Sequence, residues 1–388
     1  MSQFVHLNPS VQEWVYDPTS TQGGSQEEII HAFHKTLPDY NETPLHSLPD
    51  LAAELGLGTV LLKDESNRFG LPAFKILGAS WAVYRAVGSH LGLSVSDGSA
   101  PLTDVGAKAR EAGVRVVTLT EGNCGRAVSR MAAKIMGIRT KVFVPRYMDE
   151  QTRSKIRSEG AEVVEVDGAY DDVIPVAQRD AEANDKAILI LDVSVEGFDD
   201  IPKYFVQGYS TMLAESDRQV LELTGGKPAT HAIVPVGAGS IGEAVAAHFK
   251  SASRRKKFGS AKVISVEPTT AACLLESFKA GKSVAVQTGD TIMCGMNCGT
   301  LSTTAWPVLR DGVDASVVVT DLEAHNAVQE LKTRSILAGP CGAATLAALR
   351  RACTDAKQGL GLDSASIVVL YCTEGPREYL VSTENLRK

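Results

Sequence analysis

Short apolar runs rich in valine, isoleucine and leucine alternate with stretches of helical periodicity along most of this 388-residue chain. Near-continuous apolar runs are typical of strands that are covered on both faces, and strands separated by helices form parallel sheets. The alternation therefore predicts an α/β fold, with parallel sheets and helices on both faces. The predicted strands are Thr59–Lys63, Val114–Leu119, Lys141–Val144, Glu162–Val166, Ala187–Leu191, His231–Val236, Lys262–Val266, Ser316–Thr320 and Ser366–Cys372.

Amphipathic stretches between these strands are the predicted helices. Thr320 and Glu323 have the spacing of a capping box and mark the start of the helix Ala324–Arg334. The other helices predicted in this way are Ile76–Leu91, Gly125–Met136, Glu150–Ser158 and Gly242–Ser251.

The length of the chain indicates two or three domains, at about 100–200 residues each. Two stretches are candidate crossings between lobes: Gly88–Lys108, which carries Ser, Asp, Gly and Pro, and Leu223–Thr230, which contains Gly225-Gly226-Lys227-Pro228.

Charge and composition exclude several classes of function. The net charge of −7 and the isoelectric point near 5.7 argue against a nucleic-acid partner, which needs clustered lysine and arginine. No apolar run has the length of a membrane-spanning helix, and Met1–Ser20 lacks the apolar core of a signal peptide, so we expect a cytoplasmic protein with no membrane partner. The odd number of cysteines, seven, predicts reduced thiols. No metal is expected, because Cys294 and Cys298 have no second ligand pair at zinc-site spacing.

A glycine-rich turn joins the predicted strand His231–Val236 to a helix. It consists of Gly237, Ala238, Gly239, Ser240, Ile241 and Gly242. Glycines let backbone N–H groups approach an anion, and a helix start adds partial positive charge, so the turn is a candidate phosphate site. It also matches the dinucleotide fingerprint, with Glu267 placed where a ribose would bind, which keeps a nicotinamide oxidoreductase open. A tight turn without a ligand is the third interpretation.

Two further turns carry residues suited to chemistry. Lys75 lies between Phe74 and Ile76 at a helix entrance, where partial burial would lower its pKa and favour an imine with a carbonyl cofactor. Alternatively, Lys75 is a surface lysine with only its stem buried. Asn123, in the turn after the strand Val114–Leu119, could bind polar groups of a ligand or simply cap the following helix.

All three turns can converge at the carboxyl ends of parallel strands, where open α/β sheets bind ligands. A phosphate loop, an imine lysine and an asparagine turn together suggest pyridoxal 5'-phosphate. At this point the chain resembles the fold type II, or tryptophan synthase β-like, family of pyridoxal-phosphate enzymes, whose architecture has two lobes. The matching parts, in family order, are Thr43-Pro44-Leu45, Phe74-Lys75, Gly122-Asn123, the glycine turn, Val266-Glu267-Pro268 and Leu370–Gly375.

Within this family the chain most resembles the diaminopropionate ammonia-lyases, from about Tyr40 to the end of the last predicted strand. The stretches that carry this resemblance are Thr120–Asn123, Asp192–Phe198, Ile201-Pro202 with Gln207–Tyr209, and Ile292–Gly299. We expect a large cofactor-binding domain of residues 1–85 and 215–388, a small mobile domain of residues 86–214, and a homodimer.

The resemblance implies a role for each matching residue. Lys75 would form an aldimine with the cofactor and remove the Cα proton of an amino acid. Asn123 would bind the ring oxygen, and Gly237 to Gly242 would bind the phosphate. Cys372 or Thr373 would face the pyridine nitrogen as a neutral group.

The implied reaction is the α,β-elimination of ammonia from 2,3-diaminopropionate, which gives pyruvate and ammonia, with Glu121 and Asp192 as the further catalytic residues. Glu121 stands where the family shows aspartate, and Cys124 where it shows histidine, so the substrate stays open between diaminopropionate and serine, threonine or another β-substituted alanine. Glu121 and Asp192 could also be only helix-start and loop residues. A catalytically inactive binding protein is the remaining alternative.

Overall fold

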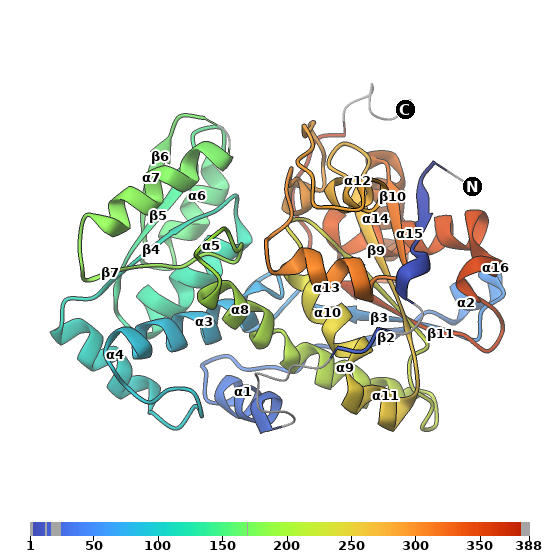
Figure 1. Cartoon of the computed structure of the whole chain (residues 1–388), viewed down its shortest axis with the longest axis horizontal. Coiled ribbons are helices and arrows are strands. Elements are labelled where there is room, and N and C mark those ends of the chain that lie inside the picture. Colours follow the sequence, from blue (N-terminus) through green and yellow to red (C-terminus); the bar gives the residue numbers. More distant parts are fainter. Residues whose placement is uncertain (1–2, 12–13, 17–24, 169, 382–388) are drawn as a thin grey trace. The chain divides into compact units, whose positions relative to one another are not determined.

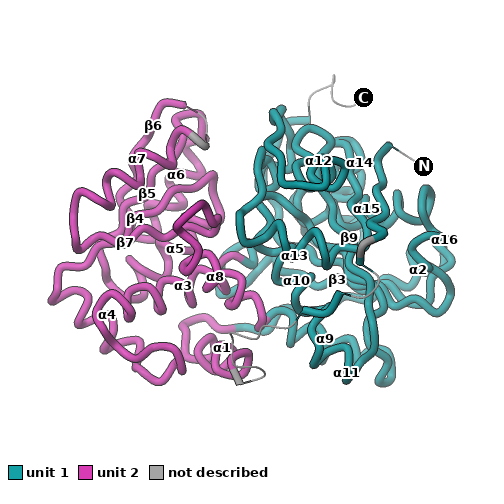
Figure 2. The backbone as a smooth tube through the Cα atoms, in the orientation of Figure 1, with its two compact units in different colours: residues 1–20, 41–74, 212–388 teal, residues 21–40, 75–211 magenta. Residues whose placement is uncertain are grey.

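The computed structural model describes residues 3–11, 14–16, 25–168 and 170–381 (Figure 1). The chain divides into two compact units (Figure 2). Unit 1 consists of Met1–Ser20, Asn41–Phe74 and Met212–Lys388, and unit 2 of Thr21–Tyr40 and Lys75–Thr211.

The division differs from the predicted domain limits at residues 75–85, 21–40 and 212–214, the last of which belong to unit 1. Residues 75–85 belong to unit 2, because α3 (Lys75–His90) packs along its length against α5 (Asn123–Ser129) and α8 (Asp200–Gly208). Residues 21–40 also belong to unit 2, where His34 Nδ1 lies 2.7 Å from Thr211 Oγ1. Neither of the two stretches predicted to cross between lobes does so, because residues 88–108 lie within unit 2 and residues 223–230 lie within unit 1.

Unit 1 contains a sheet of seven strands in the order β1-β10-β9-β8-β11-β3-β2. The five inner strands are parallel, and the two edge strands are antiparallel to their neighbours. In that order the strands are Val5–Leu7, Ala315–Val319, Lys262–Pro268, His231–Pro235, Ile367–Cys372, Thr59–Asp64 and Leu45–Ser47.

Helices cover both faces of this sheet. α15 (Pro340–Asp355) packs along β8 to β11, whereas α10 (Ser240–Lys250) packs on β8 and β9. The two helices lie on opposite faces, because Leu370 belongs to the core under α15 while its neighbour Tyr371 contacts Phe249 of α10. The other helices of unit 1 are α2 (Pro49–Leu55), α11 (Ala252–Phe258), α12 (Cys273–Ala280), α13 (Ala305–Gly312), α14 (Asp321–Thr333) and α16 (Lys357–Leu360), and α9 (Ser210–Leu223) begins at the unit boundary.

Unit 2 contains a parallel sheet of four strands in the order β6-β5-β4-β7. α7 (Tyr170–Glu182) covers one face of it, over a core that includes Val117 and Phe143. The strands are Glu162–Val166, Arg139–Pro145, Arg115–Leu119 and Ala187–Leu189. The remaining helices are α1 (Ser25–Lys35), α4 (Leu102–Glu111) and α6 (Glu150–Arg157), together with a π-helical turn, Arg130–Ile135, that continues α5.

The predicted α/β fold with parallel sheets is confirmed, and each predicted strand is present. The capping box at Thr320 is also present, since its hydroxyl accepts from the Glu323 N–H at 3.2 Å. β1 and β2 were missed, because each is short and has a histidine in the middle, so that neither forms an apolar run. No helix of the described residues is long and apolar enough to cross a membrane.

A fully buried cluster of charges lies between β3, the segment that follows it and α9. Arg68 contacts Glu65 at 2.6 Å and Glu215 at 2.7 Å, and Lys63 contacts Glu215 at 3.0 Å. The Arg68 guanidinium also donates to Thr43 Oγ1 at 2.9 Å. Burial raises the pKa of Glu215, but the hydrogen bonds and positive charge of Arg68 outweigh it and hold the pKa below its usual value. Because two cations face two carboxylates, the cluster is paired within the core.

Glu267, at the end of β9, is also fully buried. Its carboxylate accepts from the N–H groups of Leu274 and Leu275, at 2.7 and 2.9 Å, and so caps the start of α12. Burial raises the pKa of Glu267 to about 7, although these two N–H groups lower it.

Replacing Glu215 tests the buried cluster. Glu215→Gln leaves Lys63 and Arg68 with a single carboxylate, so the free energy of unfolding should fall by about 3–5 kcal/mol. Glu222→Gln is the matched control, because Glu222 lies on the same helix in an exposed pair with Arg218 and should cost less than about 1 kcal/mol. Urea unfolding followed by circular dichroism measures both, and equal losses would contradict a special role for the buried cluster.

The raised pKa of Glu267 predicts a pH-dependent stability. A carboxyl group with a pKa near 7 in the folded protein and about 4.5 in the unfolded chain binds more protons when folded, so its contribution is lost as the pH rises between these values. Between pH 5 and pH 8 we expect the free energy of unfolding to fall by about 2–3 kcal/mol more in the wild type than in Glu267→Gln, whose side chain does not titrate. Urea unfolding at several pH values measures it, with Glu276→Gln as an exposed control. Parallel curves for the wild type and Glu267→Gln would show that this carboxyl group does not titrate in that range.

Candidate active site

The residues predicted from the sequence fall into two groups, one in each unit. Unit 2 holds Lys75, Glu121, Asn123 and Asp192, and unit 1 holds the glycine turn with Cys372 and Thr373.

Lys75 is the first residue of α3, and its Nζ contacts Asp192 Oδ2. Asp192, which is 8% exposed, follows β7. Burial lowers the pKa of Lys75, but the negative charge of Asp192, followed by Tyr209 and Cys124, raises it well above its usual value. The prediction that burial leaves this lysine with a lowered pKa was therefore wrong, because a carboxylate from a distant part of the chain compensates for the lost water.

The turn that carries Asn123 leaves the sheet next to Asp192. Val117 of β4 is opposite Leu189 of β7, and each turn residue lies a few positions beyond this pair. Thr120 braces the turn, since its hydroxyl accepts from the N–H groups of Gly122 and Gly125 at 2.9 and 3.0 Å. Asn123 then starts α5, which packs against α3. The parallel strands thus bring the asparagine turn and the Lys75–Asp192 pair to one end of this sheet.

Two neighbours complete the group in unit 2. Cys124 is buried and lies near Asp192, so burial and then the charge of Asp192 raise the pKa of its thiol well above the usual value. Glu121 is partly exposed, and its Oε1 accepts from the hydroxyl of Tyr147.

Tyr147 and Tyr209 are neighbours of these residues that no sequence motif indicated. Tyr209 is fully buried and packs on α3 because both facing helices have glycine where they cross. A Cβ on Gly78 would lie 2.7 Å from Tyr209 Cε1, and one on Gly208 would lie 2.4 Å from Leu77 O. The stretch Gln207–Tyr209 is part of the family resemblance, but only the close contact between α3 and α8 explains why glycine precedes this tyrosine.

The glycine turn of unit 1 has no room for side chains at its key positions. A Cβ on Gly237 would lie 3.1 Å from Gly295 O and from Cys298 Sγ. Gly239 has a φ of +109°, and its Cβ would lie 2.7 Å from the Cβ of Ala305. α10 begins immediately afterwards, and the first N–H groups of a helix have no acceptor within the helix. The turn therefore presents backbone N–H groups and partial positive charge, as an anion site requires.

Cys372 is the last residue of β11, the neighbour of β8 in the sheet, and Thr373 follows it. Cys372 is fully buried on the face that α15 covers. Burial, followed by the charges of Asp64 and Glu374, raises the pKa of its thiol well above the usual value, so the group is neutral at pH 7.

The end of β11 also anchors the segment that leads to Lys75. The N–H of Phe74 donates to Thr373 O at 3.2 Å, and the N–H of Gly375 donates to Pro72 O at 2.9 Å. Because Lys75 follows Phe74, these bonds fix the point at which the chain enters α3.

The structure decides two further interpretations of the sequence. Glu267 is fully buried and its oxygens cap α12, so it cannot bind a ribose as the nicotinamide interpretation required. Cys273 and Cys298 form no disulfide, in agreement with the reduced thiols predicted from the odd number of cysteines.

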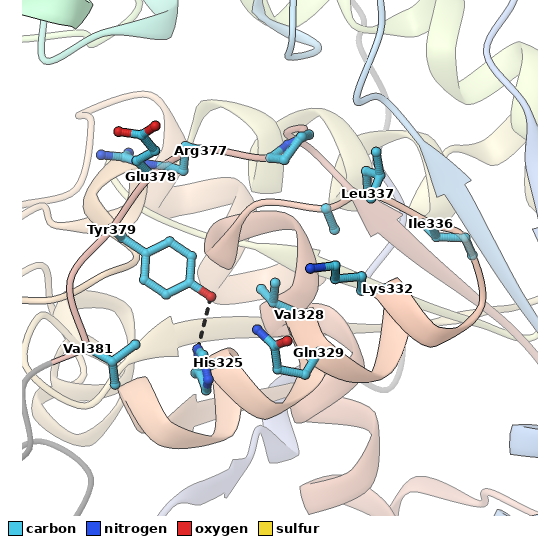
Figure 3. Close-up of a pocket in the computed structure, with 12 residues that line it drawn as sticks. His325, Val328, Gln329, Lys332, Ile336, Leu337, Arg377, Glu378, Tyr379 and Val381 are labelled. Carbon is cyan, nitrogen blue, oxygen red and sulfur yellow. Dashed lines mark hydrogen bonds between the residues drawn. The ribbon is translucent and has the colours of Figure 1, made fainter.

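A pocket of about 420 Å³ lies elsewhere in unit 1, between α14 and the C-terminal segment (Figure 3). His325 and Tyr379 are joined across it by a hydrogen bond of 3.0 Å. None of the residues predicted from the sequence lines this pocket, so it is separate from both groups.

Comparisons with known proteins agree with this geometry. The model of the family described as pyridoxal-phosphate dependent enzyme matches residues 36–373. The diaminopropionate ammonia-lyase of Salmonella typhimurium is 33% identical over 372 residues, which cover 92% of this chain and 90% of that protein. The enzyme of the same name from Escherichia coli K12 is 30% identical over 365 residues, with 90% and 88% covered.

Solved structures show the same relationship. The crystal structure of diaminopropionate ammonia lyase from Escherichia coli, in complex with an aminoacrylate-PLP azomethine reaction intermediate, has a TM-score of 0.84 at 27% identity and covers 96% of this chain and 93% of that one. Maize serine racemase shares the fold, with a TM-score of 0.70 at 23% identity over 90% and 93% of the two chains. The chain belongs to the pyridoxal-phosphate dependent enzymes, in the fold type II group that includes the diaminopropionate ammonia-lyases.

Proposed function

We propose that this chain is an ammonia-lyase that eliminates ammonia from 2,3-diaminopropionate and yields pyruvate and ammonia. The observation that carries the proposal is the pair formed by Lys75, at the start of α3, and Asp192, after β7. The names of the two bacterial relatives support the choice of substrate.

The residues present fit pyridoxal phosphate. Gly237 and Gly239 are packed too closely for a Cβ, so the turn directly before the start of α10 is bare backbone, which suits a phosphate group. We propose that Gly237 to Gly242 hold the phosphate, that Asn123 binds the ring oxygen and that Lys75 carries the cofactor. When bound, pyridoxal phosphate supplies an electron sink for the negative charge that develops at the substrate's Cα.

Lys75 and Asp192 are proposed to move the protons. An amine removes the Cα proton only in its neutral form, so Lys75 must first lose the proton that Asp192 stabilises. Asp192, which touches Lys75 Nζ, is placed to take part in that transfer and to supply a proton to the departing amine. Glu121 is the second carboxylate at this end of the sheet, and the Tyr147 hydroxyl holds its orientation.

Cys372, or failing that Thr373, is proposed to face the cofactor's ring nitrogen as a neutral group. A neutral thiol provides no negative counter-charge, so less of the substrate's charge is drawn into the ring. This arrangement favours expulsion of a β-substituent. The homodimer, the cytoplasmic location and the mobility of the small domain stay predictions.

Replacing Lys75 tests the proposed function. Lys75→Ala should abolish the release of pyruvate from L- and D-2,3-diaminopropionate, because it removes both the cofactor anchor and the base. Lys203→Ala, an exposed lysine of α8, should leave turnover unchanged. Borohydride reduction of the wild type should leave the cofactor on the peptide that contains Lys75.

The outcomes of this experiment separate the alternatives. Bound cofactor without pyruvate from either isomer would redirect the search to serine, threonine and other β-substituted alanines. Failure of the wild type to retain pyridoxal phosphate would overturn the proposal and favour a binding protein.

Replacing Asp192 tests its coupling to Lys75. In the cofactor-free protein, Asp192→Asn should lower the pKa of Lys75, since burial then acts without the opposing charge. Competitive labelling of the amine over a range of pH measures this shift, and Asp200→Asn of α8 is the control. An unchanged labelling profile would contradict the pairing.

A further inference from the structure

A second group of reactive side chains lies at the C-terminal segment of unit 1. Cys294 begins the short 3₁₀ helix Cys294–Met296, and its Sγ contacts Nη1 of Arg377. Figure 3 shows Arg377 on the segment that continues through Glu378 and Tyr379. The proposed reaction uses none of these residues.

The contact with Arg377 distinguishes Cys294 chemically. A guanidinium beside a sulfur favours the thiolate, which is the nucleophilic form of cysteine. The charge interaction is reciprocal: burial lowers the pKa of Arg377, but the charges of Cys294 and Glu374 outweigh burial and raise it. Cys294 is also partly exposed, so a small reagent can reach it.

Most other thiols of the chain are held in the neutral form. Burial is the largest cause of a raised pKa at Cys124, Cys273, Cys341, Cys353 and Cys372. Cys294 is therefore partly exposed and in contact with a cation, whereas burial raises the pKa of these five other thiols.

The short helix that starts at Cys294 packs against the glycine turn. A Cβ on Gly237 would lie 3.1 Å from Gly295 O and 3.2 Å from Met296 Cα. On its other side, a Cβ on Gly295 would lie 3.3 Å from Cys341 Sγ. The helix that carries Cys294 is therefore packed between the glycine turn and Cys341, so a displacement of this helix would reach the glycine turn.

We propose that Cys294 is a modification site, oxidised by a hydroperoxide to a sulfenic acid, and that its oxidation loosens the glycine turn. The thiolate attacks a peroxide oxygen, so that an S–O bond forms as the O–O bond breaks. The sulfur loses two electrons, the peroxide is reduced, and the departing oxygen takes up a proton, which gives water when the oxidant is hydrogen peroxide. An external thiol then condenses with the sulfenic acid to a mixed disulfide and releases water, and a further external thiol attacks this disulfide and returns Cys294 to the thiol. The effect on the turn rests on its proposed role as the phosphate site.

The site of oxidation is tested on the purified protein with hydrogen peroxide and a reagent that traps sulfenic acids. Peptide mass spectrometry should find the label on Cys294 first. Arg377→Gln should slow the labelling at pH 7 by about tenfold, because the guanidinium that favours the thiolate is gone. Arg334→Gln removes an arginine that pairs with Glu330 and should leave the rate unchanged. Earlier labelling of another cysteine, or an equal rate in Arg377→Gln, would overturn the proposed site.

The coupling to the glycine turn has a separate readout. Oxidised wild-type protein should release pyridoxal phosphate faster than reduced protein, whereas Cys294→Ser treated in the same way should not change. Equal release by oxidised and reduced wild type would overturn the coupling. Because labelling does not depend on the cofactor, a protein that fails to bind pyridoxal phosphate would refute the proposed function and leave the oxidation site standing.

Discussion

The buried cluster around Arg68 is the constraint on which the position of the reactive lysine depends. Its guanidinium donates to Glu65 and Glu215, and so ties the segment after β3 to α9. That segment continues to Phe74, whose N–H bonds the end of β11, and Lys75 follows. Buried charges tolerate little displacement, because each one that loses its partner costs several kcal/mol. The cluster therefore fixes in the core a segment that would otherwise be an ordinary loop.

The charges around Lys75 in unit 2 determine how readily its amine loses a proton. A lysine at a helix start would lose its proton readily if burial acted alone. Asp192 reverses the direction, since it holds Nζ and raises the pKa of Lys75. Burial, and then the same carboxylate, raise the pKa of the Cys124 thiol. One carboxylate thus acts on two neighbours, and its position follows from the parallel pairing of β4 with β7.

Much of the fold could be predicted because buried parallel strands read as apolar runs, and all of those runs form strands. The family resemblance was also readable, since its motifs are short and local. Properties that depend on residues far away in the sequence could not be predicted. The sign of the Lys75 pKa shift depends on Asp192, 117 positions away, and the burial of Glu267 depends on α12 lying over it. The domain limits differ for the same reason, because α1 and the start of α3 are assigned by packing.

The order of strands in unit 1 has a consequence for synthesis of the chain. β3 leaves the ribosome early, yet Thr59 pairs with Ile367 of β11, so most of the protein is made before its neighbour exists. Lys63, Glu65 and Arg68 must likewise wait for Glu215 before their charges are paired in the core. By the time Glu215 is made, the continuous stretch Lys75–Thr211 already contains all strands of the unit 2 sheet. We expect unit 2 to fold during translation, while the N-terminal part of unit 1 stays hydrated and open to chaperones until the last strand arrives.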